Sequence, residues 1–74
     1  MPKRHLRYHG FQRLEIFGFC QHTGNHKSIY INPHSWLFWR MGLQSAKDAF
    51  HYLSTEDQAF ILSGEPPDQW EDHL

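Results

Sequence analysis

The 74-residue sequence predicts an α+β fold, in which an N-terminal β-hairpin packs on two to three C-terminal helices. Aromatic and β-branched residues fill the segments FQRLEIFGFC and KSIYIN, which flank the turn-forming segment HTGNH. Apolar residues of the second half recur at spacings of three and four, which is typical of helices. We therefore expect a single small domain over residues 1–74, with a β-rich half at residues 1–34 and a helical half at residues 35–74.

The expected hairpin turns at residues 23–25, so that His22 lies opposite His26. In this register one face of the hairpin is apolar and packs on the helices, and its members are Phe17, Phe19, Ile29 and Ile31. The segment RHLRYH, residues 4–9, adds a third strand at the edge in a variant of the same fold.

Two longer helices are expected in the second half. The first has Ser35 as its N-cap and carries an apolar stripe formed by Trp36, Trp39, Leu43, Ala46, Phe50 and Leu53. Ser54 then opens a second helix, which ends at Gly64 as a C-cap before two prolines. A last short helical turn brings Trp70 back onto the domain.

The two halves carry opposite charge, although the formal net charge of the chain is only −1. Residues 1–40 hold six Lys and Arg against Glu15 alone, a balance of +5. Residues 41–74 hold Lys47 against seven acids, a balance of −6. We therefore expect a basic β-rich half and an acidic helical half, each suited to a different kind of partner.

One cysteine permits no disulfide within the chain, which suits a reducing compartment. No apolar run approaches the roughly 18 residues of a membrane span, and MPKRHLRYHG lacks the apolar core of a secretory signal. We expect a cytoplasmic protein that has no membrane partner and exists as a monomer or a homodimer.

Catalytic motifs are absent from the sequence. It has no phosphate-binding glycine loop, and its acids lie in segments without the apolar surroundings that raise a carboxyl pKa. Cys20 has His22 and His26 nearby as bases, yet nothing in the pattern supplies an oxyanion hole. We expect no enzymatic activity.

A metal site is an alternative at the expected hairpin tip, where Cys20, His22 and His26 crowd together and His34 follows. Zinc takes about four nitrogen or sulfur ligands in a tetrahedron, and these residues supply that number, with His5 or His9 as alternatives to His34 for the fourth position. Their spacings differ from the paired Cys-x2-Cys knuckle, which favours a half-buried thiol beside surface histidines. The expected cofactor is therefore none, with a structural zinc on these four residues as the alternative.

The basic half suggests nucleic-acid binding. Its candidate contacts are Lys3, Arg4, Arg7, Arg13 and Lys27 for phosphates and Tyr8, Phe11 or Tyr30 for stacking on a base. The acidic half suggests a protein partner instead, with Trp70 as an anchor among acids. The acids of this candidate surface are Glu56, Asp57, Asp68, Glu71 and Asp72.

The segment GLQSAKDAFHYLSTEDQAFILSGEPPDQWEDHL resembles the ends of small uncharacterised bacteriophage accessory proteins. These share an aromatic-x-Tyr-Leu-Ser pattern, an acidic pair, an apolar turn and Ser-Gly, followed by an aromatic residue and acids. In this chain those positions are Phe50, Tyr52, Leu53, Ser54, Glu56, Asp57, residues 60–62, Ser63, Gly64, Trp70, Glu71 and Asp72. The resemblance implies a phage accessory protein in the host cytoplasm, and it carries no catalytic or binding residue across.

Two functions are therefore predicted. The first is a small phage-type interaction protein that binds and modulates a larger host or viral protein. The second is a nucleic-acid-binding accessory factor that uses the basic hairpin, with the zinc site as an added option. The placement of the arginines relative to exposed tyrosines distinguishes them, because a shared face favours nucleic acid.

Overall fold

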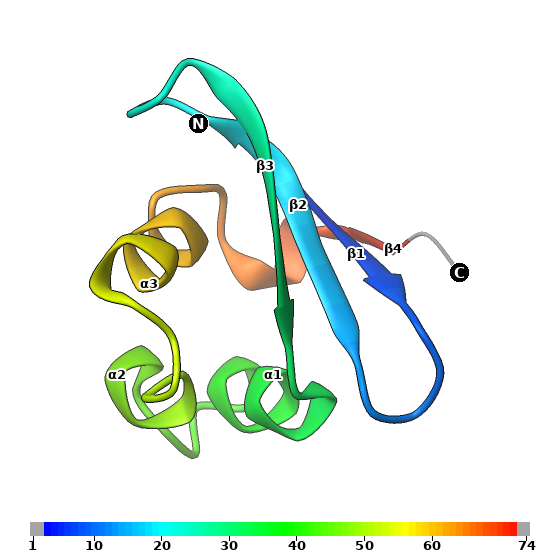
Figure 1. Cartoon of the computed structure of the whole chain (residues 1–74). Coiled ribbons are helices and arrows are strands. Elements are labelled where there is room, and N and C mark those ends of the chain that lie inside the picture. Colours follow the sequence, from blue (N-terminus) through cyan, green and yellow to red (C-terminus); the bar gives the residue numbers. More distant parts are fainter. Residues whose placement is uncertain (1–2, 73–74) are drawn as a thin grey trace.

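The computed structural model of the chain describes residues 3–72, apart from the side chains of Pro67 and Asp72. It confirms the α+β fold, with a three-stranded antiparallel sheet followed by three helices (Figure 1). In chain order the elements are β1 (Arg4–Tyr8), β2 (Leu14–Cys20), β3 (Asn25–Ile31), α1 (Pro33–Arg40), α2 (Ala46–Ala49), α3 (Thr55–Leu62), the 3₁₀ helix η1 (Pro67–Gln69) and β4 (Glu71–Asp72).

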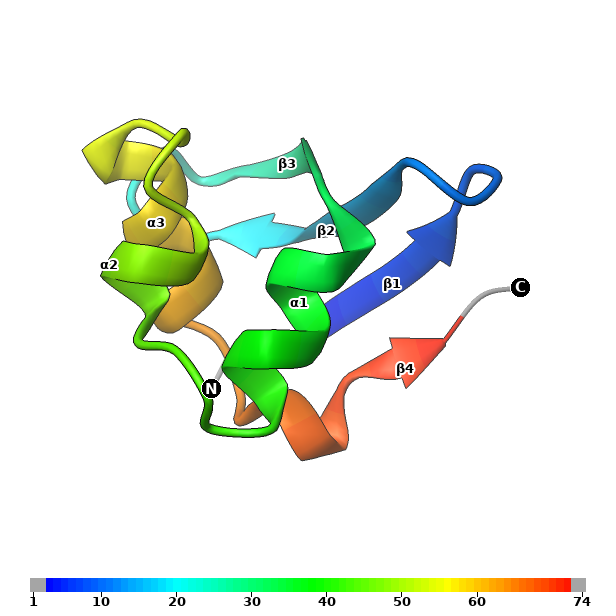
Figure 2. The same cartoon turned by 90° about the horizontal axis from the view of Figure 1, so that it is seen from below.

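The sheet has the strand order β3-β2-β1-β4. The third strand expected within residues 4–9 is present as β1, which pairs antiparallel with β2. The short β4 was not expected, and it lies parallel to β1 with His5 opposite Glu71. All three α-helices lie on one side of the sheet, so the other side stays open (Figure 2).

The predicted register of the hairpin is wrong by three residues, since Phe19 and not His22 lies opposite His26. An odd shift turns β2 over, because successive side chains of a strand point to opposite faces. The turn explains the shift: Gly24 takes the left-handed conformation at φ 72° and donates its N–H to the Cys20 carbonyl at 2.9 Å. The aliphatic residues Leu14, Ile16, Ile29 and Ile31 therefore face the helices, together with Cys20.

The first predicted helix is divided in two. Asn32, and not Ser35, caps α1 by accepting a hydrogen bond from the His34 N–H at 2.8 Å. Gly42 then reverses the chain at φ 77°, and Ser45 caps the four-residue α2. The apolar stripe is nevertheless retained in the core, except at Leu43, which is exposed.

The second predicted helix is confirmed as α3. The Ser54 hydroxyl accepts a hydrogen bond from the Asp57 N–H at 3.2 Å, as expected of an N-cap. The C-cap is Ser63, so the prediction of Gly64 in that role is wrong. Gly64 is needed for a different reason, because a Cβ at this position would lie 2.5 Å from Cγ of Arg4.

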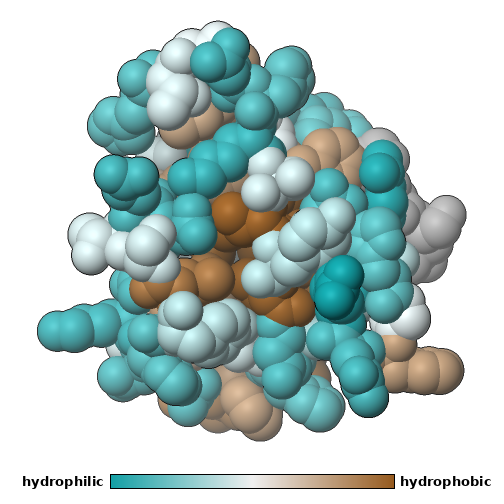
Figure 3. Space-filling view, viewed as in Figure 1, coloured by the Kyte–Doolittle hydropathy of each residue, from teal (hydrophilic) through white to brown (hydrophobic). Residues whose placement is uncertain are grey.

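The core lies between the sheet and the helices and contains a cluster of tryptophans. Trp70 stacks on Trp36 with ring centroids 4.7 Å apart, and its indole N–H donates to the Glu65 carbonyl at 2.7 Å. This confirms that the end of the chain folds back onto the domain. In Figure 3, hydrophobic residues surface in a strip between the helices and β3, with hydrophilic residues around them. No helix of residues 3–72 is long and apolar enough to cross a membrane.

Candidate binding site on the open face of the sheet

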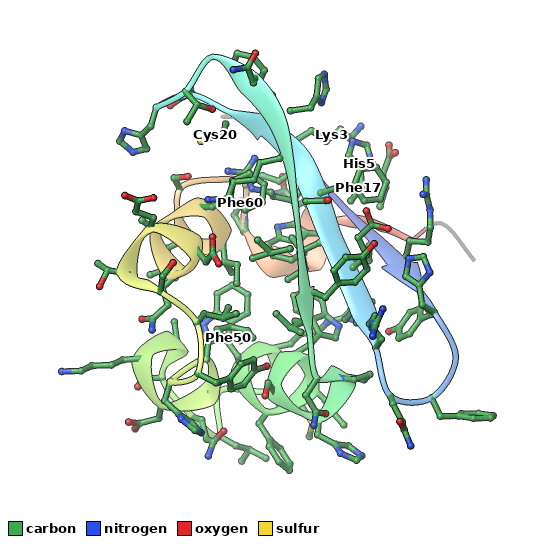
Figure 4. The ribbon with its side chains drawn as sticks, viewed as in Figure 1. Lys3, His5, Phe17, Cys20, Phe50 and Phe60 are labelled. Atoms are coloured by element: carbon green, nitrogen blue, oxygen red, sulfur yellow. The ribbon has the colours of Figure 1, made fainter. Side chains whose placement is uncertain are left out.

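The open face of the sheet is the surface that the helices leave uncovered, and it is lined by alternate residues of the strands. Its members are Lys3, His5, Arg7, Glu15, Phe17, Phe19, His26, Ser28, Tyr30 and Glu71, joined by His9 and Arg13 of the β1–β2 loop. Figure 4 shows Lys3, His5 and Phe17 on this side of the sheet and Phe50 and Phe60 on the side of the helices.

Cross-strand pairing arranges the open face in rows. One row runs from Tyr30 through Glu15 to Arg7. The next row runs from Ser28 through Phe17 to His5, and it ends at Glu71 of β4. Phe19 and His26 form the last pair near the turn, with ring centroids 6.0 Å apart. Each row thus contains one aromatic ring of Phe or Tyr on the open face.

Cationic and imidazole groups lie against these rings. The guanidinium carbon of Arg7 is 4.8 Å from the centroid of the Phe17 ring, and that of Arg13 is 5.1 Å from the Tyr30 ring. The His5 ring stacks on Phe17 at 5.0 Å between centroids. Rings with adjacent cations form a surface on which a flat, anionic ligand gains both stacking and charge contacts.

The charges of the open face are partly paired. Glu15 accepts from Nε2 of His9 at 2.8 Å, and Nη1 of Arg7 lies 3.7 Å from the same carboxylate oxygen. Nζ of Lys3 lies 2.6 Å from Glu71, whose carboxylate raises the pKa of this lysine. The lysine and two arginines exceed the two carboxylates by one charge, and protonated histidines would add to that excess.

The predicted nucleic-acid contacts separate into two groups. Arg7 lies on the open face and Arg13 beside it, as that function requires. Lys27 points to the other side of the sheet, where its Nζ lies 2.8 Å from Asp57. Tyr8 occupies the strand position of the helix-facing side, and it is partly exposed at the end of β1.

Arg4 is wrong as a phosphate contact, because it is fully buried at 0% exposure. Its Nε and Nη2 donate to the Phe60 carbonyl at 3.0 and 2.8 Å, and Nη1 donates to the Phe19 carbonyl at 3.0 Å. The guanidinium carbon is also 4.0 Å from the centroid of the Phe60 ring. Burial lowers the pKa of Arg4, yet these contacts suit a charged group that joins β1 to the end of α3.

The four predicted metal ligands do not meet as a set, although Cys20 and His22 line the same pocket beside α3. Cys20 faces the helices and is only 5% exposed, whereas His26 lies on the open face. His34 is in the first turn of α1, at the far end of β3 from the turn. The predicted register placed Cys20, His22 and His26 on one face of the hairpin. Because that register is wrong, the prediction of a metal site on these residues is wrong as well. Among the described residues, no group of three or more His, Cys, Asp or Glu side chains is placed to hold a metal ion.

The predicted acidic surface is also divided. Trp70 is buried at 8% exposure, so it is not available as an anchor for a partner. Asp57 and Glu71 are engaged with lysines of the β-rich half, as described above. Glu56 and Asp68 are exposed, and the side chain of Asp72 lies outside the described part of the chain.

A pocket of about 400 Å³ lies between the β2–β3 turn and α3. Cys20, Thr23 and Lys27 line one side, and Glu56 and Phe60 line the other. The backbone N–H and the hydroxyl of Thr23 lower the pKa of the Cys20 thiol. The thiol therefore sits in a polar corner of the core rather than in a purely apolar one.

Comparisons with models of protein families, with curated proteins and with solved structures gave no match to this chain. The site is therefore interpreted from its own geometry.

Sequence reasoning missed Glu15, Phe17 and Phe19 as residues of the exposed site. A signal was present in β2, where Leu14, Ile16, Gly18 and Cys20 alternate with these three residues. The first set is aliphatic or small, has no charge and faces the helices, whereas Glu15, although only 9% exposed, lies on the open face with Phe17 and Phe19. Alternate residues of a strand share one face of the sheet. The set that contains a glutamate is therefore expected to face away from the core, even where its other members are aromatic.

Proposed function

We propose that this protein binds single-stranded nucleic acid on the open face of its sheet. The supporting observation is the alternation of rings with cations on the open face, which lie 4.8 Å apart at the partly exposed Phe17 and Arg7 and 5.1 Å apart at the exposed Tyr30 and Arg13. Sheet surfaces of this composition suit unpaired bases, because each base stacks on a ring while its phosphate meets a neighbouring cation.

Exposure supports stacking at two of the rings. Phe19 and Tyr30 are 43% and 49% exposed, which leaves ring surface open to a ligand. Stacking of one base on one such ring contributes about 1–3 kcal/mol. Two bases and a few phosphate contacts therefore give measurable affinity, although the charge excess of the face is small.

This proposal is the second of the two functions that the sequence predicts, with a changed set of residues. Arg7, Arg13 and Tyr30 keep their expected roles, and the phenylalanine rings of the open face replace Tyr8 and Phe11 for stacking. The binding of a larger protein through the acidic half stays a prediction, and it has less support because Trp70 lies in the core. The phage resemblance stays an expectation of the same kind.

Fluorescence anisotropy with a labelled, mixed-sequence oligonucleotide of about ten residues tests the proposal. Phe19→Ser and Phe38→Ser are a matched pair, since the two rings are 43% and 40% exposed, on the open face and on α1 respectively. We expect Phe19→Ser to weaken binding at least fivefold, as about 1 kcal/mol of lost stacking requires, and Phe38→Ser to leave it unchanged.

A second matched pair tests the charge contacts. Arg13→Gln and Arg40→Gln each remove one exposed arginine, from beside Tyr30 and from the end of α1. Loss of one phosphate contact lowers the slope of log K against log salt by about 0.7 for a single strand, and we expect this only for Arg13→Gln. Absence of salt-dependent binding by the unmodified protein, or equal losses in both members of each pair, would refute the proposal.

A further inference from the structure

Glu15 is an unusual residue for a surface that binds an anion. Its residue exposure is 9%, and it occupies the centre of the open face between Arg7 and Tyr30 in one cross-strand row. A carboxylate at this position repels phosphate, so a role as a general charge contact is excluded. A contribution of Glu15 to binding would therefore come from a hydrogen bond that its carboxylate accepts from the ligand.

One oxygen of Glu15 is engaged and the other is open. His9 and Arg7 both contact Oε1, at 2.8 and 3.7 Å. Oε2 has no hydrogen-bond partner among the described residues and is not fully buried, in a side chain that is 11% exposed. The contacts at Oε1 hold the side chain in place and leave Oε2 as an oriented acceptor beside Tyr30 in the same cross-strand row.

We propose that Glu15 selects the base that stacks on Tyr30, by accepting a hydrogen bond from an exocyclic amino group. This inference rests on the proposed function. Cytosine presents such a group at N4, and a carboxylate is a suitable acceptor for it. Uracil has a carbonyl oxygen at the same position. This oxygen and the carboxylate are both acceptors, so they form no hydrogen bond and repel each other. The site therefore prefers cytosine to uracil, although the two rings stack over similar areas.

A purely structural role makes a different prediction. If Glu15 only neutralises Arg7 and His9, its replacement changes the affinity for all oligonucleotides by the same factor. If it reads a base, its replacement changes the ratio of two affinities. The ratio of dissociation constants for oligo(dU) and oligo(dC) is therefore the quantity to measure.

The experiment compares oligo(dC) and oligo(dU) of about ten nucleotides by anisotropy at pH 7.5, with the unmodified protein, Glu15→Gln and Glu71→Gln. Both variants remove one carboxylate charge from the open face, so both are expected to bind oligo(dU) more tightly than the unmodified protein does. We expect the unmodified protein and Glu71→Gln to prefer oligo(dC) by about fivefold or more, as one base contact worth 1 kcal/mol requires. Glu15→Gln is expected to bind the two within about twofold, because an amide both donates and accepts.

Each result has one meaning. Equal affinity of the unmodified protein for the two oligonucleotides, or a preference that persists in Glu15→Gln, overturns the role of Glu15 while the proposed function stands. No binding of either oligonucleotide overturns both. If Glu15→Gln fails to fold, equal affinities of the unmodified protein for the two oligonucleotides still overturn the role of Glu15.

Discussion

The buried Arg4 permits a quantitative prediction about stability. Phe60 lies in the last turn of α3, where backbone carbonyls have no helical partner, and Arg4 caps this carbonyl with two N–H groups at 2.8 and 3.0 Å. A third N–H of the same side chain bonds the Phe19 carbonyl at 3.0 Å. Replacement by methionine fills a similar volume but leaves both carbonyls without this donor.

The magnitude follows from these contacts. Loss of a hydrogen bond from a charged donor costs about 1.5–3 kcal/mol, so its loss at two carbonyls costs about 3–6 kcal/mol. The Phe60 carbonyl keeps a second donor, the Ser63 hydroxyl at 3.2 Å, which reduces the cost there. Relief of the desolvation of the guanidinium offsets part of this cost, which leaves about 3 kcal/mol for Arg4→Met. For a domain of this size, 1 kcal/mol corresponds to about 4–8 °C in the melting temperature, and the expected loss is about 15 °C.

Thermal unfolding followed by circular dichroism measures this loss. Arg7→Met is the matched control, because Arg7 is in the same strand but is exposed. Exposed ion pairs contribute at most about 1 kcal/mol, so the control is expected to lose no more than about 5 °C. Equal melting temperatures for the two variants would refute the assignment of Arg4 as a structural link between the sheet and α3.

Three further predictions concern the same packing. Gly64→Ala destabilises the fold, because the added Cβ would lie 2.5 Å from Cγ of Arg4, and its melting temperature tests this. Trp70→Ala costs about 3–5 kcal/mol in urea unfolding, as expected for a buried ring, and an unchanged midpoint would place Trp70 outside the core. The Lys27–Asp57 ion pair raises the pKa of Lys27 and so stabilises the fold below the unfolded pKa of lysine. That contribution is lost as the pH rises through the raised pKa, so Lys27→Met should unfold with a weaker alkaline dependence than the unmodified protein, and parallel pH curves would contradict this.

Local signals in the sequence were sufficient to predict β1, β2, β3 and α3, whereas β4 and the division between α1 and α2 were not predicted. The aromatic and β-branched segments predicted the strands, and Ser54 with its following acids predicted the start of α3. These features act within a few residues, so a single sequence contains them. The start of α1 was missed by three residues because Asn32 and Ser35 are both good N-caps, and Pro33 at the first helical position favours Asn32.

The register of the hairpin was less predictable, because β2 has apolar residues on both faces. Phe17 and Phe19 alternate with Leu14 and Ile16, and either pair satisfies an apolar pattern. The length of the turn determines which pair faces the core. In the structure Gly24 takes the left-handed conformation of this turn, and the neighbouring Asn25, which also tolerates that conformation, does not take it. The residues of the candidate site differ between the predicted and the observed register for this reason.

Long-range contacts had no signal in the sequence. Arg4 and Phe60 are 56 positions apart, and nothing near Arg4 distinguishes it from the exposed Arg7 three residues later. Trp70 was predicted both as a residue that folds back and as an exposed anchor, and only its stacking on Trp36 decides between the two. The basic and acidic halves likewise partly neutralise each other across the fold, at Lys27 with Asp57.

The most direct test of the central claim is an amide NMR titration of the unmodified protein with oligo(dC). Binding on the open face predicts chemical-shift changes concentrated in β1, β2 and β3 and in the β1–β2 loop, with little change in α1 and α2. Changes centred on the helices, or no change at any oligonucleotide concentration, would contradict the assignment of the open face as the nucleic-acid site.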